Sequence, residues 1–346
     1  MDKIKVGIIG MGRMGITHFS IINSHPQVEI IAIADTSKIT TDLLKKYVVG
    51  LQVFKDYKEL LEIAKPDAII VCTPPSLHYD ICKLAYEKNI HVFAEKPFTA
   101  DVNQAQSLME MFATKNLTNQ VGYVNRFNDV FITTKKYVET GLIGEIIRFK
   151  SEMFSCTVAK KEQSESWRSH VGNGSGAVYE IAAHAIDLVD YIIGKPDKIV
   201  GTSMNKFLSK NVEDIVSSTF IYKNGCSGTI YVNWCDTSYR KPANKLELFG
   251  TKGKILADQH GMKIFLNEDD TSSGYIKGWN TVYITDIFTP VPFYVRGNEF
   301  TRQLYHFADS VLGKEKGNMC SFEDGYNVQY IMDQLFIDAK KNSIIE

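Results

Sequence analysis

A glycine-rich stretch near the start of the chain constrains the fold more than any other feature. The apolar, β-branched run at residues 4–9 is followed by GMGRMG, which places Gly10, Gly12 and Gly15 in Gly-x-Gly-x-x-Gly spacing. Residues 13–23 then show helical spacing. Between a strand and a helix, the first glycine of this pattern permits a tight turn and the second lets backbone approach a pyrophosphate. The third lets helix and strand pack closely.

A second apolar run supports interpreting these glycines as a dinucleotide cradle. Residues 28–34 read VEIIAIA and lead to Asp35, twenty residues after Gly15. A carboxylate at this point accepts hydrogen bonds from the adenine-ribose hydroxyls, and its charge repels a 2′-phosphate. The spacing therefore predicts NAD as the cofactor. NADP is the alternative because Thr36, Ser37 and Lys38 follow, and an ordinary glycine-rich turn is the competing interpretation of the motif.

The first third of the chain alternates apolar runs with helical segments. Two further runs, at residues 68–72 and 90–94, lack polar alternation, which is typical of strands buried on both faces. Segments with helical spacing lie at residues 57–64, 77–88 and 103–114. This order predicts an α/β fold with a parallel, doubly wound sheet. We assign residues 1–121 to a dinucleotide-binding Rossmann domain.

Two short stretches follow the third and fourth runs, TPPSLH at residues 73–78 and EKPF at residues 95–98. Ligands of open α/β sheets bind beyond the carboxyl ends of the strands, so both stretches are expected at the cofactor site. Lys96 could polarise a carbonyl or stabilise an alkoxide there, with a solvated surface lysine as an equal alternative. The residues expected to bind the cofactor come from the glycine loop, the second strand end and these two stretches: Gly10, Gly12, Arg13, Met14, Gly15, Asp35, Thr73, Pro74, His78, Glu95 and Lys96.

The remainder of the chain shows short alternating runs separated by turns. We expect strands at residues 146–156, 215–222, 228–234, 245–250, 253–257 and 262–266, and amphipathic helices at 298–312 and 322–341. The pattern predicts a second, C-terminal α/β domain, residues 122–346, built on a broad antiparallel sheet. Helices cover one face of this sheet, and the other face is a candidate oligomer interface. Residues 270–297 either line the substrate cleft, reach a neighbouring subunit, or form a surface connection with short edge strands.

A helical segment at residues 174–196 carries a candidate acid–base pair. Glu180, His184, Asp187 and Tyr191 follow one another at offsets of four, three and four, opposite an apolar face. A carboxylate one turn from an imidazole can orient it and raise its basicity. On the helix alone, an ordinary solvated face with a stabilising pair is favoured over a catalytic site.

Composition excludes several classes of protein. The formal net charge is −1, with basic residues scattered along the chain, so we expect no nucleic-acid partner and no membrane surface. The N-terminal residues are predicted to form a strand, not a signal peptide. The six cysteines form no C-x-x-C pair and no metal-ligand spacing, which predicts reduced thiols, no metal and a cytoplasmic location.

Taken together in chain order, these motifs resemble those of the Gfo/Idh/MocA oxidoreductase family, which includes glucose-fructose oxidoreductase and inositol dehydrogenase. The matching stretches cover nearly the whole chain in family order: VGIIGMGRMG, Asp35, VCTPPSLH, FAEKPF, VGYVNRF, GLIGEI, GSGAVYEIAAHAIDLVDYIIG, ELFGTKGKI and SFEDGYNVQYI. The resemblance implies a Rossmann domain followed by an α/β domain for substrate binding and oligomerisation, with a large, mostly antiparallel sheet. It also implies a homodimer or homotetramer formed through that sheet.

The resemblance carries catalytic roles to particular residues. The lysine of the family's E-K-P motif falls on Lys96, and the bond before Pro97 is expected to be cis. The family's D-x-G-x-H helix motif reads E-I-A-A-H here, so the proton acceptor or donor falls on His184 and the acid on Glu180. This departs from the family pattern, because glutamate is one methylene longer than aspartate and alanine replaces glycine.

Three further residues correspond to elements near the substrate in the family: Arg126 after VGYVN, and Trp167 and Arg168 in a WR element. Packing and surface charge are the alternative for these three. The residues expected to contact substrate are Lys96, Arg126, Trp167, Arg168, Glu180 and His184.

The implied activity is hydride transfer between NAD(P) and a secondary hydroxyl or ketone of a sugar, polyol or nucleotide-sugar. His184 acts as the acid–base group, and Lys96 stabilises the alkoxide. Two alternatives use the same fold, namely an NAD-dependent glycoside hydrolase and a non-catalytic NAD(P)-sensing regulator. The substrate, the direction of reaction and the retention of cofactor are left open by the sequence.

Overall fold

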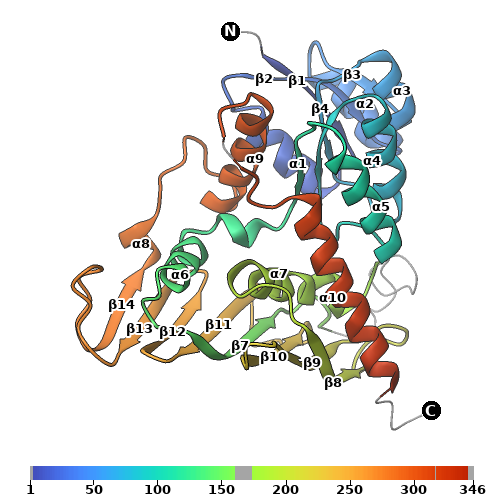
Figure 1. The fold of residues 1–346 in the computed structure, drawn as a ribbon. Coiled ribbons are helices and arrows are strands. Elements are labelled where there is room, and N and C mark those ends of the chain that lie inside the picture. Colours follow the sequence, from blue (N-terminus) through green and yellow to red (C-terminus); the bar gives the residue numbers. More distant parts are fainter. Residues whose placement is uncertain (1–2, 160–173, 316, 342–346) are drawn as a thin grey trace. The chain divides into compact units, whose positions relative to one another are not determined.

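The computed structural model describes residues 3–159, 174–315 and 317–341 (Figure 1). Contacts divide the chain into two compact units. The first comprises Met1–Val124 and Pro290–Tyr326, and the second comprises Asn125–Thr289 and Asn327–Glu346. These contacts group a segment of the C-terminal third with the N-terminal unit, whereas the sequence-based boundary took each domain as one continuous stretch.

The first unit contains a six-stranded parallel sheet in the order β3-β2-β1-β4-β5-β6. Its strands, in chain order, are β1 (Ile4–Ile9), β2 (Val28–Ala34), β3 (Gln52–Phe54), β4 (Ala68–Val71), β5 (His91–Ala94) and β6 (Asn119–Val121). The order reverses between β1 and β4, which is where open α/β sheets bind ligands at the carboxyl ends of the strands. The predicted doubly wound sheet is therefore confirmed.

Helices connect these strands as the βαβ pattern requires. They are α1 (Arg13–Ile22), α2 (Lys38–Tyr47), α3 (Tyr57–Ile63), α4 (His78–Glu87) and α5 (Val102–Ala113), with a short 3₁₀ helix (Pro75–Leu77) before α4. A further helix of this unit, α9 (Asn298–Val311), comes from the C-terminal third of the chain and packs against α1. The sequence patterns did not predict α2, β3 or β6. In α2, Thr41 alone is buried, and the apolar residues Ile39, Leu43 and Tyr47 are exposed. Its start is fixed by Ser37, whose side chain accepts a hydrogen bond from the backbone of Thr40.

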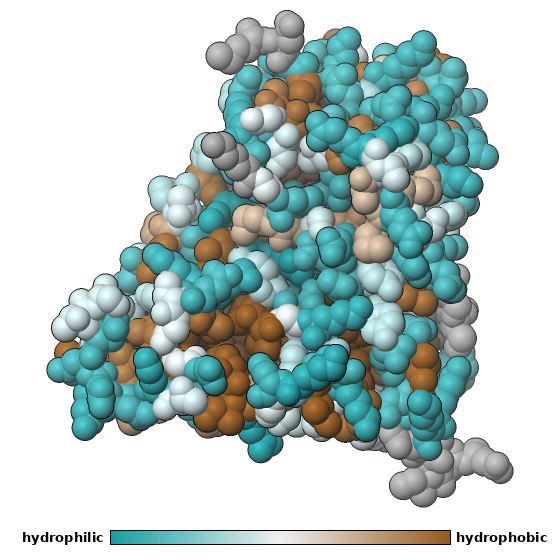
Figure 2. Space-filling model, in the orientation of Figure 1, coloured by the Kyte–Doolittle hydropathy of each residue, from teal (hydrophilic) through white to brown (hydrophobic). Residues whose placement is uncertain are grey.

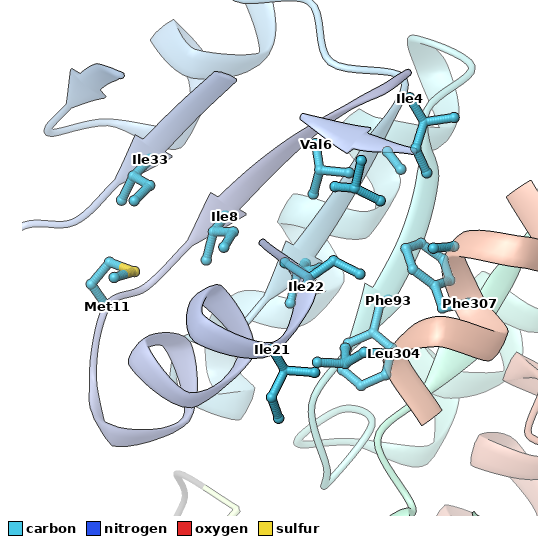
Figure 3. Packing of buried hydrophobic residues seen from close by; sticks show 14 residues of the cluster. Ile4, Val6, Ile8, Met11, Ile21, Ile22, Ile33, Phe93, Leu304 and Phe307 are labelled. Carbon is cyan, nitrogen blue, oxygen red and sulfur yellow. The ribbon is translucent and has the colours of Figure 1, made fainter. Parts of the chain in front are cut away.

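Apolar side chains cover both faces of this sheet, which explains the continuous apolar runs. On one face, Ile4, Val6 and Ile8 belong to a core cluster with side chains of α1 and α9 (Figure 3). On the other face, a Cβ added to Gly7 would lie 3.0 Å from the side chain of Leu60 in α3. Strands enclosed on both sides need no polar alternation.

The second unit contains an eight-stranded sheet in the order β14-β13-β12-β11-β7-β10-β9-β8. Its strands are β7 (Ile146–Phe154), β8 (Lys198–Asn205), β9 (Ile215–Ile221), β10 (Ser227–Asn233), β11 (Ala243–Gly250), β12 (Gly253–Asp258), β13 (Gly261–Leu266) and β14 (Gly278–Tyr283). All pairings are antiparallel except β7 with β10, which is parallel. The predicted mostly antiparallel sheet is confirmed, with this central exception.

Helices cover one face of the second sheet. Helix α6 (Asp129–Glu139) and helix α7 (Ala183–Ile192) lie on the same side of it (Figure 1). A π-helical turn, Val178–Ala182, leads into α7. Burial alternates along β9, β10, β12 and β13, as expected for a sheet with one covered face.

The elements that remain to be described are the short helix α8 (Ile284–Ile287), which follows β14, and the last helix, α10 (Phe322–Lys341). Residues 270–297 include edge strand β14 and helix α8, so this segment contains the edge strand that the sequence left as one option. Helix α10 begins in the first unit and ends in the second.

Candidate active site

The glycine loop after β1 is sterically required at two of its three glycines. Gly10 has φ +92°, and a Cβ on it would lie 2.8 Å from the carbonyl oxygen of Cys72. A Cβ on Gly15 would lie 2.0 Å from the carbonyl oxygen of Gly10. These two glycines allow strand, turn and helix to approach one another, as the spacing predicted.

The middle glycine meets no such constraint from the protein. Among the residues that the structure describes, nothing lies within 4 Å of a Cβ placed on Gly12, and no side chain caps the start of α1. The loop is therefore open at the helix N-terminus, where unsatisfied N–H groups and the helix dipole favour an anion. Arg13 is exposed and Met14 is half-buried in the same turn. This open cradle fits the pyrophosphate of a dinucleotide.

Asp35 lies at the carboxyl end of β2 and reaches back to the glycine loop. Its carboxylate accepts hydrogen bonds from the backbone N–H of Met11 at 2.6 Å and of Ser37 at 2.7 Å. A carboxylate offers about four acceptor positions, so both oxygens keep capacity for ribose hydroxyls. The side chain is only half-buried, which leaves it accessible to a ligand. The geometry suits the predicted role.

The stretch after β4 forms a turn beside the glycine loop. The hydroxyl oxygen of Thr73 is buried, and it has no hydrogen-bond partner among the described residues. A buried polar atom of this kind calls for a partner from water or a ligand. Pro74 is exposed.

His78 has a different place from the one predicted. Its ring has no exposed surface, and its Nε2 and Nδ1 lie 2.9 Å and 3.1 Å from the carbonyl oxygens of Thr73 and Phe98. Burial lowers the pKa of His78, so the ring is neutral and one nitrogen at a time donates. His78 therefore links the turn at Thr73 to the turn at Phe98 through hydrogen bonds, and it has no exposed surface that a cofactor could contact.

Glu95 and Lys96 follow β5 directly. Oε1 of Glu95 lies 2.5 Å from Nε2 of His18 in α1, and Oε2 accepts a hydrogen bond from the backbone N–H of Lys96 at 3.1 Å. Burial acts to raise the pKa of Glu95, but the hydrogen bond and charge of His18, with the charge of Lys96, hold it below its ordinary value. Glu95 is thus an ionised internal anchor. The sequence patterns did not single out His18.

The anchor presents a single accessible side chain at this strand end. Within residues 92–99, every residue except Lys96 is buried. The bond between Lys96 and Pro97 is cis, which confirms that expectation. On the other side of Glu95, a Cβ on Gly122 would lie 3.2 Å from the carboxylate, so glycine leaves room for it.

The helical segment with Glu180 and His184 starts differently from the expected α-helix. Residues Val178–Ala182 form a π-helical turn, whose i→i+5 hydrogen bonds change the angular offset between Glu180 and the positions that follow. Both side chains are half-buried, while most of their neighbours in the helix are buried. Turns of this type are frequent at functional sites.

A buried glutamate holds the start of this turn. The N–H of Val178 donates to Oε1 of Glu213 at 2.9 Å, and the N–H of Ala177 donates to the carbonyl oxygen of Glu213 at 3.0 Å. Gly176 has φ +100°, and a Cβ on it would lie 2.3 Å from Oε1 of Glu213. Burial raises the pKa of Glu213 to about 7. Glu213 lies distant in sequence from the helix, which is why the motif analysis missed it.

The predicted polar stripe does not continue as a solvated face. Asp187 is fully buried, and its Oδ1 lies 2.8 Å from Nε of Arg126. Arg126 is also buried, and its Nη2 lies 3.6 Å from Oδ2 of Asp190. The geometry favours the packing alternative for Arg126, and a contact with substrate stays a prediction. The other two residues of that group, Trp167 and Arg168, lie outside the described residues.

The described residues hold neither a metal-ligand cluster nor a membrane-spanning helix. Across residues 3–159, 174–315 and 317–341, no group of three or more His, Cys, Asp or Glu side chains could hold a metal ion. No helix in the same ranges is long and apolar enough to cross a membrane.

The fold and the glycine loop are typical of a dinucleotide-binding domain, and comparisons with known proteins identify the family. Residues 4–123 match the family described as "Oxidoreductase family, NAD-binding Rossmann fold", and residues 131–256 match "GFO/IDH/MocA C-terminal domain". The chain belongs to the Gfo/Idh/MocA oxidoreductase family.

Individual relatives are distant. An uncharacterized oxidoreductase of Schizosaccharomyces pombe is 30% identical over 57% of this chain, and the match spans only 54% of that relative's length. A myo-inositol 2-dehydrogenase of Thermotoga maritima is 24% identical over 74% of this chain and 75% of its own. A solved structure of levoglucosan dehydrogenase in complex with NADH and levoglucosan has a TM-score of 0.85. It is 23% identical and covers 99% of this chain and 98% of its own, which shows a shared fold.

Proposed function

We propose that the protein is a dehydrogenase of sugars or polyols that oxidises a secondary hydroxyl to a ketone or catalyses the reverse reduction. NAD, when bound, supplies the hydride acceptor. One observation carries the proposal: each unit has accessible acid–base side chains among residues that are mostly buried. They are Lys96 after β5 in the first unit, and Glu180 with His184 at the π-helical turn in the second. The two dehydrogenases named above act on a cyclic polyol and an anhydrosugar, which supports a carbohydrate-like substrate.

The proposed chemistry balances as alcohol plus NAD⁺ giving ketone, NADH and a proton. His184 accepts the hydroxyl proton as general base, a role that contributes on the order of 10²–10⁴-fold. Lys96 stabilises the developing alkoxide with its ammonium group. Glu180 orients either His184 or Lys96. Within the first unit, Gly12 and the start of α1 bind the pyrophosphate, and Asp35 binds the adenine ribose.

Absorbance at 340 nm tests the activity directly. The purified protein is mixed with NAD or NADP and a panel of polyols, monosaccharides and nucleotide sugars, and the matching ketones are run with NADH. Turnover with one substrate class supports the proposal. Silence across the panel with intact NAD binding by calorimetry would refute it and favour the hydrolase or the sensor, and an aryl glycoside assay separates those two.

His184→Ala tests the general base. We expect kcat to fall about 10²-fold or more while NADH affinity by calorimetry stays within about twofold, because the imidazole acts on substrate. His260→Ala is the matched control, since His260 is an exposed histidine of the same unit. Equal losses of kcat and NADH affinity would count against the role.

Asp35→Ala tests the choice of cofactor. Removing the carboxylate removes an acceptor for the ribose hydroxyls and a charge that repels a 2′-phosphate, so the ratio of NAD to NADP affinity should fall about tenfold or more. Asp42→Ala, which removes an exposed carboxylate on α2, should leave the ratio unchanged. An unaltered ratio in Asp35→Ala refutes the assignment.

We also propose that the protein assembles as a homodimer or homotetramer through the second sheet. Ile221 and Phe249 are exposed, and they share one face of the sheet, because Ile221 on β9 pairs with Ser227, Ser227 pairs with Arg148, and Arg148 pairs with Phe249 on β11. Figure 2 shows hydrophobic side chains gathered over this part of the second unit. Light scattering after size exclusion tests the assembly, and Phe249→Asp should shift the protein toward monomer. A monomeric wild type would overturn the proposal.

A further inference from the structure

A second arginine, distant in sequence, lies beside the glycine loop. Arg296 directly precedes Gly297 and α9, in a segment that the contacts group with the first unit. Its Nη1 lies 3.6 Å from the sulfur of Met14, in the first turn of α1. The sequence analysis assigned no role to Arg296, because nothing in its neighbourhood follows a motif.

The positive charges at this point lack an ion-pair partner. Among the described residues, neither Arg296 nor Arg13 forms an ion pair with a carboxylate. Burial lowers the pKa of Arg296, the charge of Arg13 lowers it further, and the charge of Glu95 opposes both, so the two guanidinium groups are close enough to repel. Like charges that converge beside a helix N-terminus raise the positive potential there, and an anion would relieve it.

The backbone and neighbours hold Arg296 in place. Its φ of +79° is rare for a residue with a side chain and costs free energy. The guanidinium lies over the ring of Phe300, 5.2 Å from its centroid. A side chain held at this cost over an open loop is typical of a ligand-binding position, and planar guanidinium groups match phosphate oxygens well.

We propose that Arg296 is a cofactor-binding residue that, together with Arg13, binds the pyrophosphate of the dinucleotide over Gly12. Met14 belongs to the same helical turn as the open cradle at Gly12, which places Arg296 at the pyrophosphate position. The 2′-position of the ribose belongs instead to Asp35 at the end of β2. The inference depends on cofactor binding alone, not on the identity of the substrate.

Calorimetry of Arg296→Gln tests the proposal without any turnover. We expect affinities for NADH and ADP to fall on the order of 10–100-fold, while the affinity for adenosine, which lacks phosphate, is unchanged. Arg13→Gln should behave in the same way. The salt dependence of NADH binding should weaken in Arg296→Gln, because a charged contact is lost.

A control variant and a set of cofactor fragments distinguish pyrophosphate binding from a structural role and from binding of a 2′-phosphate. Lys83→Gln removes an exposed cation from α4 of the same unit and should leave all affinities unchanged. Wild-type affinity for NADH in Arg296→Gln would overturn the proposal, as would an equal loss of adenosine binding. A loss confined to NADPH and 2′,5′-ADP would place the arginine at the 2′-phosphate and also overturn it. If wild type binds NADH but turns over no substrate, the proposed activity fails and this inference stands on the binding data.

Discussion

Replacing Glu213 by glutamine should change the pH dependence of stability in a defined window. Glu213 is 7% exposed, and its carboxylate accepts the hydrogen bond that begins the π-helical turn before α7. Burial raises its pKa from 4.5 to about 7, and the charge of Asp214 adds to this, whereas the N–H of Val178 and the charge of Lys206 oppose it. The carboxylate is thus buried at a free-energy cost when it is ionised.

The sign and size of the effect follow from these values. Between pH 4.5 and about 7, the folded state binds this proton more strongly than the unfolded state, so stability falls as the pH rises through that window. The difference between the two pKa values corresponds to about 3 kcal/mol. Glu213→Gln stays neutral, and its amide oxygen can still accept from Val178. The variant should therefore match wild type at pH 4.5 and exceed its free energy of unfolding by about 3 kcal/mol at pH 8.

Urea denaturation followed by tryptophan fluorescence is a suitable assay. All three tryptophans, at positions 167, 234 and 279, fall in the chain segment of the second unit. Subtracting wild type from variant at each pH cancels the contributions of other groups. Glu268→Gln, which removes an exposed carboxylate of the same unit, is the control. An offset between wild type and Glu213→Gln that is constant with pH, or a variant less stable at pH 8, would refute the reasoning.

Three further substitutions test the glycine loop and the buried ion pair. Gly15→Ala places a Cβ 2.0 Å from the carbonyl oxygen of Gly10 and should lower both the melting temperature and NADH affinity. Gly12→Ala meets open space, so it should lower NADH affinity alone, and a comparable loss of melting temperature in both variants would contradict this. Asp187→Ala leaves the buried guanidinium of Arg126 without its 2.8 Å partner and should cost about 3–5 kcal/mol in urea denaturation. A loss below about 1 kcal/mol would show that the pair contributes little.

The parallel sheet was predictable because its signals are local and repeated. Apolar runs without alternation mark strands enclosed on both faces, and β1, β2, β4 and β5 all carry them. By contrast, β3 and β6 have three residues each, too few to show a period. The parallel pairing of β7 with β10 could not be predicted either, because alternation indicates which face of a strand is buried and not the direction of the neighbouring strand.

The residues of the candidate site also fall into two groups, those that a local motif predicts and those that it does not. The positions of Gly10, Gly15 and Asp35 around the loop could be predicted, because a motif of fixed spacing places them there. His18, Glu213 and Arg296 could not, because each meets its partner across a long separation: 77 residues for His18 with Glu95 and 282 for Arg296 with Met14. Sequence spacing predicts neighbours within one helix or one turn. Contacts between elements depend on how the elements pack.

The buried pair of Asp187 and Arg126 shows where helical spacing misleads. The offsets among Glu180, His184 and Asp187 assume 3.6 residues per turn, but the chain passes through a π-helical turn at Val178–Ala182. After such a turn, a position that regular spacing assigns to a solvated stripe can face the core. Asp187 is tolerated there because Arg126 compensates its charge. Glu180 and His184 are half-buried while most of their neighbours are buried, so a departure from the regular helix accompanies the part of the motif that we propose as catalytic.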